Sequence, residues 1–355
     1  MDIKGLDQIS AQEKNDLKKR INNSIVRYRS RKKNQRKVIY YAAAVIGFMI
    51  IPSVILLIKH DMQQSAIEKY VSARKEKNID NFQQDVQLRI GEENIIKLAA
   101  RDTIVSYTQS ASTNKIRVNN KVVYDTEHQT GPLNKAIYNS LEVPYGKHSF
   151  MTLSDGTKVW LNAGTVLTYP LRFSENKREV FLQGEAIFDV AHNKEKPFYV
   201  HTTNGKIRVL GTVFNVYSYP DESKTYTALL KGKVEAIYEK STLLGTTITS
   251  ELRPGMIASY DSEKKSVKVT HENVEPYMKW REGVLVFKNE KLESIINKIA
   301  RYYNIKVKVN NQSSMFKTFS GSLDIKDSLH DIMLIIKETT AIDYTLGSDN
   351  TLLIN

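Results

Sequence analysis

The chain has 355 residues and no cysteine, which excludes disulfides, thiolate catalysis and cysteine-ligated metal centres. Its net charge of +13 would suit a nucleic-acid-binding protein, but the charge is unevenly distributed. Residues 1–60 hold 13 Lys and Arg against four Asp and Glu, and thus carry most of the excess. The basic character therefore indicates membrane topology and attraction to anionic lipid headgroups, with no direct binding of nucleic acid.

Residues 1–37 are predicted to form a cytoplasmic amphipathic helical tail. Ser10 and Glu13 have capping-box spacing, and apolar side chains then recur at helical intervals. These apolar positions are Leu17, Ile21, Ile25 and Tyr28. An isolated helix of this length is marginal in water, so we expect its apolar face to contact a partner or the membrane surface. A solvated juxtamembrane helix is the alternative.

Residues 38–58 are predicted to cross a membrane once as a helix. This segment has no charged side chain, and as a helix it would span ~31 Å, close to the thickness of a bilayer core. Ten Lys and Arg lie between residues 18 and 37, which places the N-terminus in the cytoplasm and the later domains in the periplasm. A cleaved signal peptide would have a shorter apolar region. Gly47 and Pro52 weaken the helix locally, and mark either a kink or a candidate region for intramembrane cleavage.

Residues 59–140 are predicted to be a periplasmic stalk followed by the first strands. Residues 62–77 are polar and favour a helix, and short alternating apolar runs begin near residue 85. In residues 141–262 such runs become dense and are separated by turn signals such as Asp155-Gly156 and Lys231-Gly232. This pattern predicts an antiparallel all-β sandwich or roll.

Residues 280–355 change to an alternation of strands and helices. A helix is expected over 292–303, with Leu292, Ile295, Ile296 and Ile299 on one face, and a second helix over 329–336. The predicted order βαββαβ(β) favours a small α+β domain whose helices cover one face of a sheet. The chain is thus expected to be membrane-anchored and multidomain.

The sequence gives no sign of a catalytic, cofactor or metal site. Asp189, His192 and His201 come closest to a cluster, but they fit the polar positions of a hairpin. Glu185 and Asp189 are four residues apart on a strand, or ~13 Å, whereas a retaining glycosidase needs its two carboxylates ~5 Å apart. Aromatic side chains in this region are interpreted as core: Phe181, Phe188, Phe198, Phe214 and Tyr217.

A series of short motifs in residues 141–355 resembles one family. The motifs are LSDGTKVWLNAG at 153–164, REVFL at 178–182, GEAIFDV at 184–190, PFYV at 197–200 and LGTVFNV at 210–216. Together they resemble the FecR family of transmembrane anti-sigma factors and sensors. Trp280 and the later motifs FKNEKL at 287–292, ARYY at 300–303 and FSG at 319–321 are similar to the C-terminal domain of Bacteroidetes-type members, which resembles the secretin and TonB short N-terminal fold.

The resemblance implies signal transduction without catalysis. Such a protein would contact the N-terminal signalling domain of an outer-membrane TonB-dependent transporter and would control an extracytoplasmic-function sigma factor in the cytoplasm. The tail of 37 residues is short for this family, so one helix would lie in a groove of the sigma factor. The alternatives are a membrane-tethered binding or scaffold protein without a sigma partner, and an envelope enzyme acting on glycans through Glu185.

Overall fold

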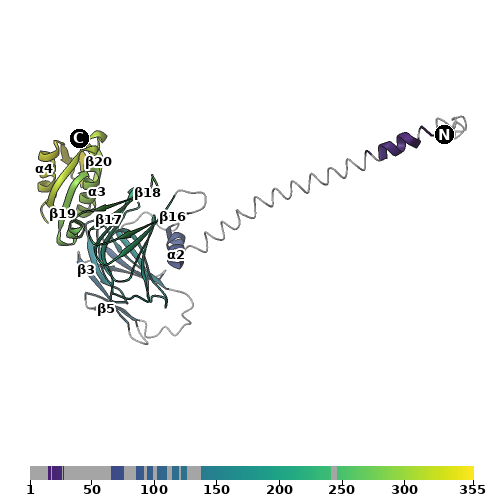
Figure 1. Cartoon of the computed structure of the whole chain (residues 1–355). Helices are drawn as coiled ribbons and strands as arrows, with labels where there is room; N and C mark the ends of the chain where they lie inside the picture. The colour runs from purple at the N-terminus through teal and green to yellow at the C-terminus, as the bar shows by residue number, and fades with distance from the viewer. Residues whose placement is uncertain are drawn as a thin grey trace, which may run out of the picture. The chain divides into compact units, whose positions relative to one another are not determined.

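The computed structural model divides the chain into two compact units, Met1–Gln64 and Ser65–Asn355 (Figure 1). The described residues are 15–16, 18–25, 27, 65–75, 85–91, 94–98, 102–109, 114–119, 121–125, 137–240 and 246–355. In the first unit, residues 18–25 are helical. Among the described residues no helix is long and apolar enough to cross a membrane. The predicted span at 38–58 lies outside those residues.

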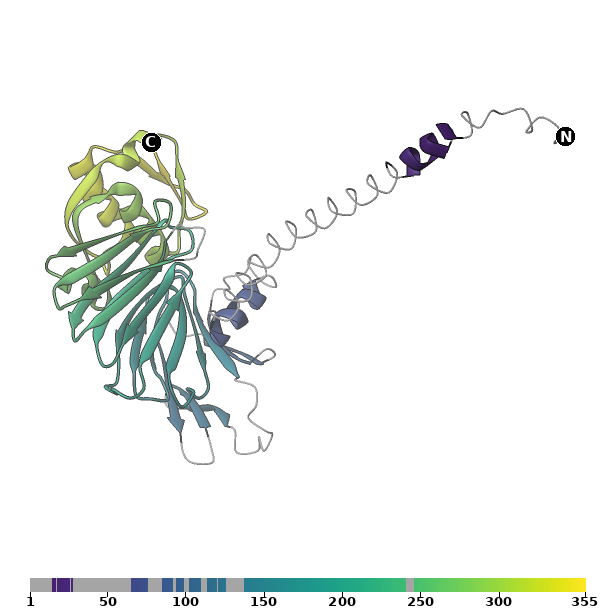
Figure 2. The same cartoon turned by 45° about the vertical axis from the view of Figure 1, so that its right-hand side comes forward.

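Two twisted sheets of mostly antiparallel strands form a sandwich in the second unit (Figure 2). The first sheet has the order β2 (Asn94–Leu98), β1 (Val86–Ile90), β6 (Tyr138–Val143), β9 (Thr165–Pro170), β10 (Arg178–Asp189), β11 (Phe198–Thr202), β12 (Gly205–Val209), β15 (Val234–Glu239), β16 (Thr247–Leu252). The second has the order β5 (Lys121–Asp125), β4 (Asn114–Val118), β3 (Asp102–Gln109), β7 (His148–Thr152), β8 (Lys158–Leu161), β10, β13 (Val213–Ser218), β14 (Lys224–Lys231), β17 (Met256–Asp261), β18 (Ser266–His271). Strand β10 belongs to both sheets.

The passage of β10 from one sheet to the other depends on Gly184. Before it, Phe181 pairs with Thr168 of the first sheet, and after it Ala186 pairs with strands of the second. Gly184 has φ +113°, and a Cβ on it would lie 2.7 Å from the Cα of Thr165. Any other residue would meet both backbone strain and this contact, so glycine allows the strand to change sheets.

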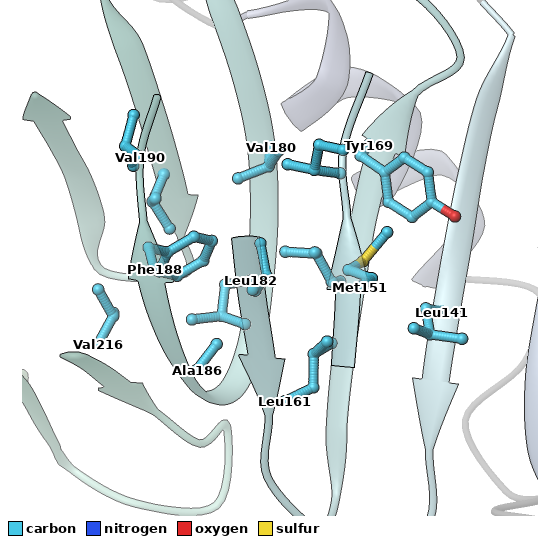
Figure 3. Packing of buried hydrophobic residues seen from close by; sticks show 14 of the residues in the cluster. Leu141, Met151, Leu161, Tyr169, Val180, Leu182, Ala186, Phe188, Val190 and Val216 are labelled. Atoms are coloured by element: carbon cyan, nitrogen blue, oxygen red, sulfur yellow. The ribbon is translucent and has the colours of Figure 1, made fainter. Parts of the chain in front are cut away.

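The core of the sandwich consists of apolar side chains that alternate along strands of both sheets. Leu161, Leu182 and Phe188 are fully buried and point into the same core (Figure 3). The Phe188 ring stacks on Phe214 with centroids 5.3 Å apart. Each such side chain contributes about 1.5–3 kcal/mol by burial. The interpretation of the five aromatic residues as buried is confirmed.

The sandwich begins earlier in the chain than residue 141. Strand β6 runs through the predicted boundary and pairs with β1, so the first strands are part of the sandwich. Helix α2 (Ala66–Lys75) matches the predicted polar helix, but it packs on the sandwich near β9 and β10 (Figure 1). Its Ile67 is fully buried. The described residues between 66 and 140 therefore pack with the sandwich.

The C-terminal α+β domain has the predicted element order. It contains β19 (Val284–Lys291), α3 (Leu292–Tyr303), β20 (Lys306–Val309), η3 (Gln312–Phe316), β21 (Thr318–Asp324), α4 (Leu329–Thr340), β22 (Tyr344–Leu346) and β23 (Thr351–Ile354), after the 3-10 segment η2 (Glu275–Glu282). The predicted face of α3 is buried in one core with α4. Its strands form two small sheets, β19–β21 and β20–β23–β22, where one was expected.

Replacement of Gly184 by alanine should destabilise the sandwich more than a substitution that adds strain alone. Gly156 is the matched control, because it has φ +85° and no atom would contact its Cβ within 4 Å. We expect Gly156→Ala to cost about 1–2 kcal/mol and Gly184→Ala about 3–5 kcal/mol, since overpacking is added to strain. Urea unfolding measures both, and equal losses would contradict the role given to Gly184.

Candidate functional site

The C-terminal domain is joined to the sandwich through a buried arginine. Arg301 Nη1 donates to the Tyr217 hydroxyl at 3.0 Å and to Glu222 Oε1 at 2.6 Å. Its Nη2 donates to Asp221 Oδ2 at 2.9 Å, and the guanidinium lies 3.7 Å from the centre of the Tyr219 ring. The side chain is 5 % exposed. The guanidinium of Arg301 thus contacts both β13 and the turn that follows it.

The position of Arg301 follows from the pattern of α3. The buried apolar face of this helix ends at Ile299, and Arg301 in the last turn is turned towards the sandwich. A cation there is favoured by the helix dipole. Asn304 ends the helix with a left-handed conformation, and the carbonyl of Arg301 accepts a hydrogen bond from Gly146 N at 2.8 Å. Backbone and side chain of one residue therefore make the contact together.

A buried carboxylate lies beside this arginine. Asn215 Nδ2 donates to Glu185 Oε1 and Asn162 Nδ2 donates to Glu185 Oε2, both at 2.8 Å. Burial raises the pKa of Glu185, although the two amides and the charges of Lys298 and Arg301 act in the opposite direction. The remaining cavity, about 20 Å³, has room for roughly one water molecule. Asp189 is exposed, so the two carboxylates have different surroundings.

The junction specifies how the two domains dock more than it adds stability. Desolvation of a buried ion pair offsets most of its attraction, and apolar replacement of such groups is often neutral. Removal of one partner costs about 3–5 kcal/mol, because a buried charge is left alone. Only the arrangement that places Arg301 over Tyr219 and Glu222 satisfies these groups.

A second polar contact fastens α2 to the sandwich. His201 is 2 % exposed, and its Nδ1 lies 2.9 Å from Glu68 Oε1 while its Nε2 lies 3.1 Å from Glu179 Oε1. Arg74 of α2 also pairs with Glu142. We call the group Glu68, His201 and Glu179 the α2 clasp.

The α2 clasp shifts the pKa values of its members. Burial alone would lower the pKa of His201, but hydrogen bonds and the charges of Glu179 and Glu68 outweigh it and raise the pKa above 6.5. Burial would raise the pKa of Glu68, but its bonds to His201 and Ser65 lower it to about 2. The pKa of Glu179 is also lowered, because His201 and Lys177 outweigh its burial.

The structure describes only some of the residues predicted from sequence. Ile21 and Ile25 lie four positions apart on the helix of residues 18–25, with exposures of 51 % and 42 %. Leu17, Tyr28, Gly47 and Pro52 lie outside the described residues. The polar cluster around His201 has other members than expected: its partners are Glu68 and Glu179, and His192 is exposed beside Gly211.

Sequence reasoning missed both the Arg301 junction and the α2 clasp as sites. A signal existed for the junction, because Asn162, Glu185, Asn215 and Arg301 all belong to the motifs noted above. Their convergence at one place from four elements explains why these motifs contain polar residues. For the clasp, Glu179 and His201 lie on strands more than 100 residues after Glu68 of α2, so the spacing of the three residues gives no signal.

The order and junction of these domains define a class: a β-sandwich with a small α+β domain docked on it through buried polar groups. Residues 140–235 match the FecR protein family, and residues 284–354 match the FecR C-terminal family. The chain belongs to the FecR family. None of the curated proteins matches it.

Two crystal structures of a proposed anti-sigma factor from Parabacteroides distasonis ATCC 8503, at 1.65 and 2.50 Å resolution, resemble this chain. Each is 29 % identical in sequence, with a TM-score of 0.56, over 61 % of this chain and 98 % of the other. The similarity supports the FecR assignment.

Replacement of Arg301 by methionine should weaken the folded state strongly, because Glu222, whose side chain is only 14 % exposed, would keep its charge without its cation. We expect a loss of about 3–5 kcal/mol in urea unfolding, part of which Glu222→Gln recovers in the double variant. Arg208 is the control: its ion pair with Glu235 at 3.0 Å is partly exposed, so Arg208→Met should cost at most about 1 kcal/mol. Similar losses for both would contradict a specific junction.

The α2 clasp should make stability depend on pH in a defined direction. Because the pKa of His201 is raised on folding, its contribution is complete below about pH 6.5 and is lost as pH rises through the folded pKa. The lowered pKa values of Glu68 and Glu179 give contributions present above about pH 4.5 and lost as pH falls.

Unfolding free energies at about pH 5.5 and about pH 9 measure this dependence. His201→Gln should lower stability most at the lower pH and flatten the profile, whereas His192→Gln, at an exposed site, should keep the wild-type slope. An unchanged slope in His201→Gln would show that the clasp is not charged.

Proposed function

We propose that this FecR-family protein is a single-pass inner-membrane regulator of an extracytoplasmic-function sigma factor. It would relay a signal from an outer-membrane TonB-dependent transporter to transcription. Support for a sigma-factor regulator comes from the family and from its similarity to a proposed anti-sigma factor. The observation that carries the proposal is that both family domains are present in order, in a chain whose N-terminal helix exposes two isoleucines on one face.

The N-terminal helix is the proposed contact for the sigma factor. Ile21 and Ile25 are exposed, and Leu17 and Tyr28 extend the same periodic pattern in the sequence. Full burial of each isoleucine contributes about 1.5–3 kcal/mol, enough for one helix to bind a groove.

The proposed topology places this helix in the cytoplasm and the sandwich in the periplasm. It is supported by the uncharged residues 38–58 and the basic segment before them, which also favours anionic lipid headgroups. Helix α2 begins eight residues after this segment and is fastened to the sandwich by Glu68 and Arg74. A change in the sandwich would therefore reach the membrane through α2.

The periplasmic partner would be the signalling domain of the transporter. The sandwich has edge strands at β2, β16, β5 and β18, and an extended partner segment can add to such an edge by main-chain hydrogen bonds. The proposal includes no catalytic activity. Glu185, on which an enzymatic alternative would depend, has both carboxylate oxygens bonded to amides at the domain junction.

A charged residue on the apolar face of the tail should weaken binding to the sigma factor. We expect Ile21→Asp or Ile25→Asp in the full chain to weaken co-purification with an extracytoplasmic-function sigma factor by at least about tenfold, because a charge would enter an apolar contact. Asn23→Asp is the control, since Asn23 is exposed on the opposite side of the helix.

If the wild-type chain binds none of the cell's sigma factors, the proposal is wrong, and the alternative of a membrane-tethered scaffold protein remains. Equal weakening by Asn23→Asp would show a general charge effect and would contradict the helix-face contact.

A further inference from the structure

A cleft of about 370 Å³ lies between the sandwich and the elements that follow it. Its walls come from β3, β7 and β8 of the second sheet, from η2, and from the C-terminal domain at Tyr302 and Lys326. This volume is within the range of small-molecule sites. The cleft neighbours the Arg301 junction, because Trp280 and Tyr302 line both.

Aromatic rings form much of the lining. Phe150 and Trp160 have centroids 5.0 Å apart, and His148 lies 5.3 Å from Tyr302 and 6.2 Å from Trp280. These rings are held by neighbouring strands and by the docked domain, so their faces are fixed before a ligand arrives. Flat faces at such spacing favour a planar or cyclic apolar group.

The polar groups of the cleft favour an anion. The guanidinium carbon of Arg281 lies 5.5 Å from the centre of the Trp160 ring. The carbon chain of Lys326 lies directly beside Gly283, in the space that a side chain at that position would fill. The one acidic residue in the lining, Glu282, is 3.7 Å from Arg281 with a side chain that is 60 % exposed. Two cations against one exposed anion leave a positive excess.

We propose that this cleft binds a small cyclic or aromatic carboxylate. The ring would lie against Phe150 and Trp160, and the carboxylate would accept hydrogen bonds from Lys326 or Arg281. Because the walls belong to both domains, the bound ligand would bridge them and stabilise their docking. The site goes beyond the proposed function and does not require a sigma factor.

The chain offers a direct readout. It contains two tryptophans, Trp160 and Trp280, and both line the cleft. Tryptophan fluorescence of the full chain in detergent micelles therefore reports on this cleft and on the Arg301 junction beside it. The probe is phenylacetate, and 2-phenylethanol is its uncharged analogue of similar shape.

Phenylacetate should shift the fluorescence in a saturable way, with a dissociation constant of roughly 1 mM for a ligand of this size, and should raise the unfolding midpoint. We expect 2-phenylethanol to bind about tenfold more weakly, as a charge-assisted hydrogen bond is lost. Lys326→Gln and Arg281→Gln should each weaken phenylacetate several-fold, whereas Lys268→Gln on β18, an exposed control, should not.

The absence of a saturable change with phenylacetate would overturn the proposal. Equal binding of phenylacetate and 2-phenylethanol would overturn the anionic character of the ligand. If Lys326→Gln, Arg281→Gln and Lys268→Gln bound phenylacetate with equal affinity, the probe would bind outside the cleft. None of these outcomes depends on the sigma factor, so failure of this site and failure of the proposed function are distinguishable.

Discussion

The docking of the C-terminal domain depends on one buried cation. Arg301 is enclosed by Tyr217, Tyr219 and Glu222, and it reaches them only if the end of α3 lies against β13. A guanidinium cannot lose its proton and is costly to bury alone, so the fold must supply these partners or leave the domain undocked. Its backbone carbonyl is satisfied by Gly146, which holds the helix end to the sandwich at a second point.

Other features of the second unit follow from this constraint. Glu185 is buried beside the arginine, where Asn162 and Asn215 take the place of water around its oxygens. Tyr302, the next residue after Arg301, forms a wall of the aromatic cleft. Loss of the docked state would therefore open the cleft and expose the carboxylate together, which couples these sites through the position of one helix.

Local patterns predicted the elements well because each element follows its own periodicity. Helix α3 has the expected bounds, since Leu292, Ile295 and Ile299 define an apolar face and Asn304 can adopt a left-handed conformation. Long-range pairing was harder. The change of sheet at Gly184 depends on close approach to Thr165, and the contact of α2 with the sandwich depends on His201, 133 residues beyond Glu68. Neither Thr165 nor His201 can be identified as a contact from the spacing of residues along the chain.

Two parts of the chain, α2 and the C-terminal domain, are attached to the sandwich by contacts that differ from those in its core. Its interior is a large set of buried apolar side chains, whereas α2 and the C-terminal domain add ionised groups around His201 and Arg301 to smaller apolar contacts, at Ile67 and at the cluster of Ile187, Met278 and Trp280. Apolar burial is insensitive to local charge, but each polar contact can be released at a cost of a few kcal/mol. Ligand binding or a protonation change is therefore large enough to strengthen or weaken either attachment while the core stays folded. Helix α2 and the C-terminal domain would then be held more or less firmly on the sandwich while all three stay folded.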